Sequence, residues 1–265
     1  MAALAFEKYE GLGNDFVVLA GPSAAIDPAL VPKLCDRRFG VGADGVLLVL
    51  PATEGGAARM KVRNADGSVP EMCGNGLRCV ALLVVEAQGR REGEVAIETD
   101  AGLRVCRVVR SGDGEGEVDV DMGVVRVTGQ TTLAAAGLSI DLTLADAGNP
   151  HAVAYRDDPA GDLSRVGPAL TSHPAFPHGT NVELVRWVGE ILECHVWERG
   201  VGPTLACGTG ACGVVAVAIS RHEAQSGQPI RVRLPGGDLH ITHDANTGST
   251  RMRGPARRVY RGDWT

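Results

Sequence analysis

The 265-residue sequence has few aromatic side chains, no long hydrophobic run and no excess of positive charge. Phe, Trp and Tyr together make up 4% of the chain, and the formal net charge is −6. A general nucleic-acid binder is usually basic, so this class is not expected. No stretch approaches the roughly 18 apolar residues that span a membrane, and residues 1–10 lack the apolar run of an export signal. We therefore expect a cytoplasmic protein that binds neither nucleic acid nor membrane.

The seven cysteines do not follow the pattern of a disulfide framework or a metal site. An odd number in a chain without a secretory signal favours a reducing compartment. Five residues separate Cys73 from Cys79 and four separate Cys207 from Cys212, no histidine has matched spacing, and structural zinc sites usually leave two to four. No Gly-Lys-Ser/Thr follows the neighbouring glycines, which excludes the usual phosphate-binding loop. The cysteine spacing therefore argues against a zinc site, and the glycine motifs are not those of a phosphate-binding loop.

Glycine is abundant instead, with 36 residues, which is typical of many tight turns and close backbone approaches. Short apolar segments between glycine-rich turns predict strands. Residues 112–117 are expected to form a polar loop, and the arginine-rich stretch 251–261 a solvated strand face. The predicted strands lie near residues 6–20 (interrupted at 11–15), 46–50, 59–63, 95–99, 103–109, 140–144, 182–188 and 191–197.

Two segments, residues 76–88 and 210–224, are rich in Ala, Val, Leu and Cys. Their first turns are apolar on nearly every side, which is typical of helices buried in a protein interior. We therefore expect each half of the chain to wrap strands around one central helix.

The two halves also resemble each other in sequence. Met72-Cys73-Gly74-Asn75-Gly76 matches Ala206-Cys207-Gly208-Thr209-Gly210, and Gly13-Asn14 matches Gly148-Asn149. The asparagine and cysteine are 59 residues apart in the first half (14 to 73) and 58 apart in the second (149 to 207). Two motifs in the same order at nearly equal spacing indicate an internal duplication.

Each Cys-Gly-x-Gly turn places a cysteine directly before a predicted buried helix. The first N–H groups of a helix lack internal partners and lie at the positive end of its dipole. Such a position binds anions and lowers the pKa of a thiol below its free value of about 8.5. Glycines at the second and fourth positions let a ligand approach the backbone closely. Each half is therefore expected to hold an activated thiol beside an anion-binding turn.

Two such sites suit the inversion of an amino-acid α-carbon. Removing the α-hydrogen leaves a carbanion beside a carboxylate, and preorganised N–H donors stabilise that charge. Inversion also needs one acid/base group on each face, one entering as thiolate and the other as thiol. Cys73 and Cys207 are the candidates, although either cysteine alone could be a small buried packing residue. The other cysteines are expected to be packing residues: Cys35, Cys79, Cys106, Cys194 and Cys212.

With these motifs the chain resembles the diaminopimelate epimerase family over nearly its whole length. Together the matching segments are highly specific, whereas a single Cys-Gly-x-Gly would not be. Gly45 stands where some members carry Gln, and Pro203 where Glu is usual. The segments are residues 11–16 (GLGNDF), 38–45 (RFGVGADG), 64–68 (NADGS), 71–79 (EMCGNGLRC), 148–153 (GNPHAV), 179–183 (GTNVE), 197–202 (WERGVG) and 205–212 (LACGTGAC).

The resemblance implies a mixed α/β (α+β) fold of two pseudo-symmetric domains, each a curved mixed sheet around a central helix. The expected domains are residues 1–122, joined by the C-terminal segment 253–265, and residues 123–252. The resemblance also implies a homodimer that interconverts LL- and meso-diaminopimelate without pyridoxal phosphate or metal. This reaction lies on the route to lysine and to peptidoglycan.

The resemblance assigns the acid/base roles to Cys73 and Cys207. His151 is expected either to tune a thiol or to be a hydrogen-bonded structural histidine. Asparagine also forms turns, so one or two of the implied asparagines could be structural. The implied substrate-binding residues are Gly74, Asn75, Gly208 and Thr209 for the reacting carboxylate, Asn14 for the same end, and Asn64, Asn149, Asn181, Glu198 and Arg199 for the distal amino-acid head.

Three other functions would also use this fold or these cysteines. A related two-thiol racemase acting on proline, hydroxyproline or histidine would change the distal residues, and a thiol redox sensor would not need them. A non-catalytic binding protein of the same fold would be expected to lose one cysteine. The set of distal polar residues favours a substrate with a second amino-acid head, because planar Arg199 can bind a carboxylate through two hydrogen bonds.

Overall fold

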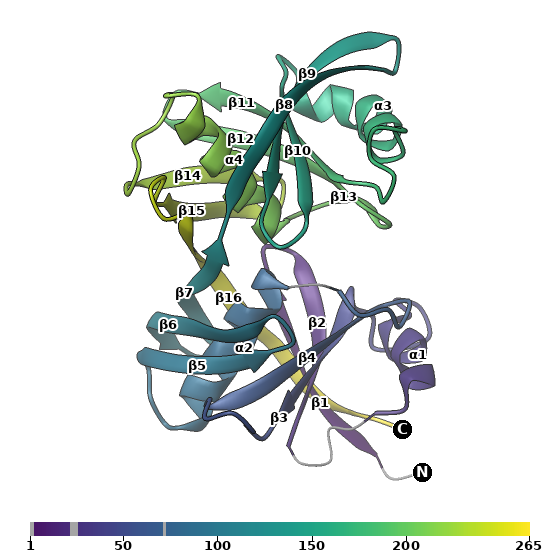
Figure 1. The fold of residues 1–265 in the computed structure, drawn as a ribbon. Coiled ribbons are helices and arrows are strands. Elements are labelled where there is room, and N and C mark those ends of the chain that lie inside the picture. Colours follow the sequence, from purple (N-terminus) through teal and green to yellow (C-terminus); the bar gives the residue numbers. More distant parts are fainter. Residues whose placement is uncertain (1–2, 22–25, 71–72) are drawn as a thin grey trace. The chain divides into compact units, whose positions relative to one another are not determined.

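The computed structural model describes residues 3–21, 26–70 and 73–265 and divides into two compact units (Figure 1). The first unit holds Met1–Val120 and Gly254–Thr265, and the second holds Asp121–Arg253. Glu71 and Met72 of the first cysteine motif lie outside the described residues.

The first unit is a mixed sheet whose strands follow one another in chain order. Strands β2 and β3 pair in parallel, as do β4 and β5, and β16 (Ser249–Trp264) pairs antiparallel with β1. Helix α2 (Gly74–Ala87) contacts β1, β5 and β6, and most of its residues are buried. The other elements are β1 (Leu4–Gly11), β2 (Asn14–Ala20), η1 (Pro28–Leu30), α1 (Val31–Cys35), β3 (Gly45–Leu50), β4 (Ala58–Asn64), β5 (Gly93–Thr99), β6 (Gly102–Gly112) and β7 (Glu115–Val124).

The second unit repeats this plan. Strands β10 and β11 pair in parallel, and the strand order is β15-β14-β12-β11-β10-β9-β8. Helix α4 (Gly208–Ser220) is buried from Gly208 to Ile219 and contacts strands from β8 to β15. The other elements are β8 (Arg126–Ala135), β9 (Leu138–Asp146), β10 (Pro150–Tyr155), α3 (Pro159–Thr171), β11 (Asn181–Val188), β12 (Ile191–Glu198), β13 (Gly202–Thr204), β14 (Pro229–Leu234) and β15 (Gly237–His243).

The predicted central helices and the mixed α/β (α+β) class are confirmed, and Figure 1 shows α2 and α4 each among the strands of its own unit. A helix that is apolar all round is stable only where other elements cover it, which explains this placement. The sequence prediction missed α1 and α3. Helix α3 begins with a readable signal, because Asp158 caps it by accepting a hydrogen bond from Gly161 N at 3.1 Å. Among the described residues, no helix is long and apolar enough to cross a membrane.

Two other predictions concern the edges of the sheets. The prediction of a loop over residues 112–117 is wrong in extent. Strand β6 ends at Gly112 and β7 begins at Glu115, so only Asp113 (φ 55°) and Gly114 (φ 83°) form the turn of a hairpin. Two left-handed residues are what a tight two-residue hairpin turn requires. The predicted solvated strand face at residues 251–261 is confirmed on β16. There Arg257 and Arg261 point to solvent, and their Nε atoms lie 3.1 and 3.2 Å from carboxylates of β1.

A buried carboxylate fixes one loop of the first unit. Glu98 on β5 is 1% exposed and accepts backbone hydrogen bonds from Thr53 (2.9 Å), Glu54 (2.5 Å) and Gly56 (3.0 Å). These N–H donors stabilise the charged form and lower the pKa of Glu98 to about 2. The loop between β3 and β4 therefore depends on an ionised carboxylate.

Candidate active site

Cys73 is the N-cap residue of α2, and its extended backbone (φ −140°, ψ 90°) leads directly into the buried helix. Its Sγ accepts a hydrogen bond from Gly76 N at 3.3 Å. This bond takes the place that an oxygen acceptor fills in an ordinary cap, and it satisfies one of the orphan donors of the helix. As a residue, Cys73 is partly exposed.

Cys207 repeats this geometry at α4, with its Sγ 3.4 Å from Gly210 N. The Oγ1 of Thr209 lies 3.4 Å from the same sulfur. Cys207 is only 6% exposed, in contrast to Cys73. Each unit thus presents a sulfur and the first N–H groups of a helix together, as both motifs predict.

The expectation that the helix terminus lowers the thiol pKa is wrong for Cys207. Burial raises the pKa of this thiol well above its ordinary value, and the carboxylates of Glu198 and Glu183 raise it further. The hydrogen bonds from Thr209 and Gly210 act in the expected direction but are outweighed. Desolvation penalises the charged thiolate more than two hydrogen bonds stabilise it. Burial and the two carboxylates therefore favour the thiol form of Cys207 over the thiolate.

The glycine at the fourth position of each Cys-Gly-x-Gly motif is required by the protein's own packing, which the sequence did not predict. A Cβ on Gly76 would lie 2.9 Å from Leu47 Cδ2 and 3.1 Å from Cys73 Sγ. A Cβ on Gly210 would lie 2.6 Å from Glu183 Oε1 and 3.3 Å from Cys207 Sγ. These glycines let a strand side chain and the cysteine sulfur approach the helix together.

In the first unit, Asn14 lies in a hydrogen-bonded row at the start of β2. Its Oδ1 accepts from Asn75 Nδ2 at 3.1 Å, and its Nδ2 donates to Asp44 Oδ2 at 2.9 Å. The carboxylate of Asp44 also accepts from Arg37 at 2.6 Å. The structure therefore brings Asn14 and Asn75 together and adds Asp44, which lies in a matching motif but had no predicted role.

Asn64 lies at the end of β4, where its Nδ2 donates to Ser68 Oγ at 2.9 Å. This bond fits the turn-forming alternative as well as a substrate-binding one. Asn64 pairs with Gly45 across β3 and β4, and a Cβ on Gly45 would lie 2.5 Å from Arg63 O. A larger residue at position 45 would therefore need a shift of the neighbouring strand. Pro203, the other departure, lies in β13 opposite Trp197.

The second unit groups most of the residues predicted for the distal head. Asn181 Oδ1 accepts from Arg199 N at 2.9 Å, and Asn181 Nδ2 donates to Pro150 O at 3.1 Å. Glu198 accepts from Thr204 Oγ1 at 2.6 Å. The side chain of Arg199 packs against the left-handed Gly179 (φ 70°), whose added Cβ would lie 3.0 Å from Arg199 Cδ. Asn181 thus holds the backbone that carries Arg199.

His151 and Asn149 form part of a second hydrogen-bonded row in this unit. The ring of His151 joins Glu183 Oε1 (2.7 Å from Nδ1) to Asn149 Oδ1 (2.9 Å from Nε2). Asn149 Nδ2 donates to Thr209 Oγ1 at 3.4 Å. Glu183 had no predicted role, although a glutamate within the apolar run of β11 was a visible signal.

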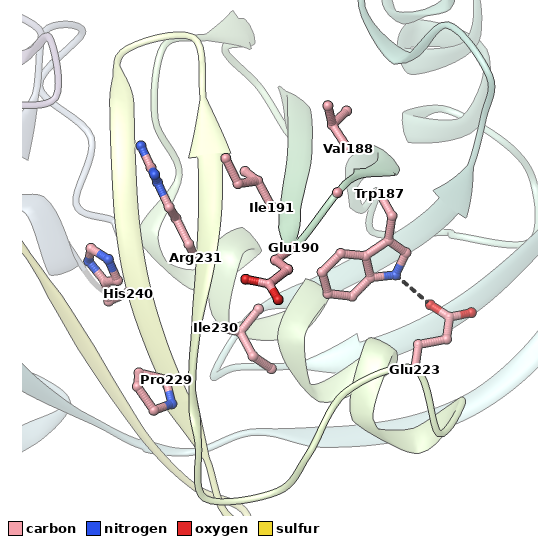
Figure 2. Close-up of a pocket in the computed structure, with 10 residues that line it drawn as sticks. Trp187, Val188, Glu190, Ile191, Glu223, Pro229, Ile230, Arg231 and His240 are labelled. Atoms are coloured by element: carbon pink, nitrogen blue, oxygen red, sulfur yellow. Dashed lines mark hydrogen bonds between the residues drawn. The ribbon is translucent and has the colours of Figure 1, made fainter.

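A separate surface pocket of about 970 Å³ lies in the second unit (Figure 2). Its walls include Trp187, Glu190, Glu223 and His240, and Trp187 Nε1 donates to Glu223 at 3.0 Å. None of the predicted site residues is in its wall. The candidate site residues of each unit therefore lie at its cysteine cap and its polar row, apart from this pocket.

Comparisons with known proteins give the family of the chain. The family model described as diaminopimelate epimerase matches residues 6–128 and 143–259. The chain is 43% identical to diaminopimelate epimerase of Thermosynechococcus vestitus, covering 98% of this chain and 99% of that protein. It is 41% identical to the enzyme of the same name from Synechocystis, with 98% coverage of both.

A solved structure of a predicted epimerase from Pseudomonas aeruginosa has the same fold, with a TM-score of 0.79 at 18% identity and 98% coverage of both chains. The fold, the two cysteine caps and the full-length sequence matches lead to one conclusion. The chain belongs to the diaminopimelate epimerase family and is an isomerase of the amino-acid epimerase class.

Proposed function

We propose that the chain interconverts LL- and meso-diaminopimelate, with Cys73 and Cys207 as the two acid/base groups. The substrate follows from the family and from the names of relatives above 40% identity. One observation supports the mechanism: each unit carries a cysteine at the N-cap of a buried helix, with its sulfur held by an N–H three residues on. Two sulfur sites, one in each unit, are what a two-base inversion requires.

In the proposed reaction, one cysteine enters as thiolate and removes the α-proton. The electron pair of the broken C–H bond remains on the α-carbon and is delocalised into the adjacent carboxylate. The other cysteine, as thiol, then donates its proton to the opposite face. The thiolate and thiol have thereby exchanged roles, so the reverse reaction runs by the same steps. General acid/base groups of this kind typically contribute 10²–10⁴-fold.

The first N–H groups of both helices supply the charge stabilisation in this proposal. They belong to Gly74 and Asn75 on α2 and to Gly208 and Thr209 on α4, and the reacting carboxylate would accept from them. Preorganised donors of this type contribute several kcal/mol where charge develops, roughly 3 for a single donor. Asn14, held between Asn75 and Asp44, would orient the same end of the substrate.

The distal amino-acid head would be bound by Asn64, Asn149, Asn181, Glu198 and Arg199. A zwitterionic head needs both an anion and a cation, and Glu198 and Arg199 are adjacent at the end of β12. Arg199 would hold the distal carboxylate and Glu198 the ammonium group. Lysine and alanine lack such a head, so the proposal includes that both are poor substrates.

The proposal extends to the setting of the reaction. The acid/base chemistry is complete with two thiols, so pyridoxal phosphate and metal are not needed. The reaction would supply lysine and peptidoglycan precursors in the cytoplasm, and the enzyme would act as a homodimer. Size-exclusion chromatography with light scattering tests the dimer.

Incubation of the purified protein with LL-diaminopimelate in D₂O tests the function. Wild type should form the meso isomer with deuterium at the inverted α-carbon. Cys73→Ala and Cys207→Ala should each lower the rate by at least about 10²-fold. Cys35→Ala removes a buried thiol outside both motifs and should retain activity. Activity within about tenfold of wild type in either motif variant would refute the two-thiol mechanism.

A further inference from the structure

The two units place different side chains at matching positions behind their cysteines. Phe16 lies two residues after Asn14, and His151 lies two residues after Asn149. Phe16 pairs with Gly45 in the parallel ladder β2–β3, and His151 pairs with Asn181 in β10–β11. The parallel pair β2–β3 in the first unit and the parallel pair β10–β11 in the second therefore begin at corresponding residues.

The next inward positions on β3 and β11 show the difference. Leu47 lies two residues after Gly45 on β3, and Glu183 lies two residues after Asn181 on β11. Each side chain contacts the point where a Cβ would stand on the last glycine of its unit's Cys-Gly-x-Gly motif. The first unit thus carries the apolar pair Phe16–Leu47 where the second carries the polar pair His151–Glu183. The fold itself is satisfied by apolar residues at these two places.

Burying Glu183 at this position is unfavourable for stability. Its side chain is fully buried, and among the described residues its Oε2 has no hydrogen-bond partner. A buried polar atom without a partner costs about 1–3 kcal/mol, and more if the group is charged. Since Leu47 fills the equivalent place at no such cost, packing does not account for Glu183.

A continuous row of side chains leads from Glu183 to the sulfur of Cys207. The row passes through His151, Asn149 and Thr209, with successive separations of 2.7, 2.9, 3.4 and 3.4 Å. Asn149 Nδ2 donates to Thr209 Oγ1, and its Oδ1 faces the ring of His151. The hydroxyl of Thr209 is then left to donate to the sulfur.

The carboxylate of Glu183 is also a close neighbour of that sulfur. Both Oε1 and Sγ lie within 3.3 Å of the point that a Cβ on Gly210 would occupy. Among the described residues, Glu198 on β12 is the other carboxylate that acts on the Cys207 thiol, and His151 on β10 contacts Glu183 itself. A nearby negative charge opposes thiolate formation, whereas the Thr209 hydroxyl favours it.

We propose that Glu183 is a positioning residue that makes Cys207 chemically unlike Cys73. Its carboxylate fixes His151, and through it Asn149 and Thr209, and its position beside the Cys207 sulfur opposes the loss of the thiol proton. The inference rests on the proposed function only in giving Cys207 an acid/base role. The burial of the Glu183 and Cys207 side chains and the raised pKa of the Cys207 thiol agree with this inference.

The test measures alkylation of the two cysteines in the folded, substrate-free protein by iodoacetamide, followed by mass spectrometry of each peptide. At pH 8, Cys207 in Glu183→Gln should react about tenfold faster than in wild type, which corresponds to one pKa unit. Thr209→Val removes the favourable hydroxyl and should slow the same reaction. Cys73 is the internal reference, and its rate should not change in either variant.

Two further variants complete the design. Glu190→Gln makes the same chemical change on an exposed residue and should leave both rates unchanged. The double variant His151→Phe with Glu183→Leu gives the second unit the apolar pair of the first. Replacing a buried polar pair by apolar residues of similar volume is often neutral or stabilising, so this variant should fold even if Glu183→Gln does not. It should also accelerate Cys207 alkylation.

An unchanged Cys207 rate in a folded Glu183→Gln or double variant would overturn the inference. Epimerisation measured on the same samples separates it from the proposed function. A faster Cys207 with unaltered epimerase activity would support the role of Glu183 and would contradict the acid/base role of Cys207. A faster Cys207 with lowered activity would support both.

Discussion

Two glycines in helix α4 should respond in opposite ways to alanine, because the structure surrounds them differently. A Cβ on Gly210 would overlap Glu183 Oε1 at 2.6 Å, and that carboxylate is held by His151. A Cβ on Gly213 would meet Ala145 Cβ at 3.5 Å, an ordinary contact. The pair lies within one buried helix, so each variant controls for the other.

The expected magnitudes follow from these contacts. Overpacking a core costs about 1–3 kcal/mol, and the fixed carboxylate places Gly210→Ala near the upper end. Alanine offsets about 1 kcal/mol of this because it favours the helix. Gly210→Ala should therefore lose about 2 kcal/mol of unfolding free energy, whereas Gly213→Ala should gain about 0.4–1 kcal/mol. Urea denaturation of the three proteins measures both changes. Equal shifts of the same sign would refute the placement of Glu183 against α4.

Three other variants test separate parts of the structure. Asp44→Asn removes the charged acceptor of Asn14 Nδ2, so KM for diaminopimelate should rise several-fold in steady-state kinetics while Tm changes little; an unchanged KM would contradict the role of Asn14. Arg199→Met removes the proposed partner of the distal carboxylate and should raise KM at least about tenfold, and an unchanged KM would point to a broader racemase. Glu98 has a pKa lowered from 4.5 to about 2, so its stabilising effect is present above pH 4.5 and is lost as the pH falls from 4.5 towards 2. Glu98→Gln should be less stable than wild type at pH 7 but should lose less unfolding free energy between pH 5 and pH 3, as measured by urea denaturation at each pH. An equal loss of unfolding free energy in the two proteins over this range would show that Glu98 does not titrate as described.

Much of the site could be predicted from the sequence because its signals are local. A cysteine followed by Gly-x-Gly and an all-apolar run specifies a capped, buried helix, and the structure shows this at both Cys73 and Cys207. Some glycines with left-handed φ, such as Gly137 and Gly189, likewise lie in the turns between neighbouring strands. Helix α3 was missed although Asp158 caps it, because Gly167 and Pro168 weaken its helical pattern.

Only the tertiary structure decided how side chains from separate strands meet. The register of β10 against β11 places His151 beside Glu183, and packing against α4 places both behind Cys207. Local sequence carries helix caps and turns, but it does not specify which strands become neighbours or how much water they exclude. The helix terminus at Cys207 could therefore be predicted from its motif. The raised pKa of its thiol could not, because that pKa depends on burial and on carboxylates brought in from β11 and β12.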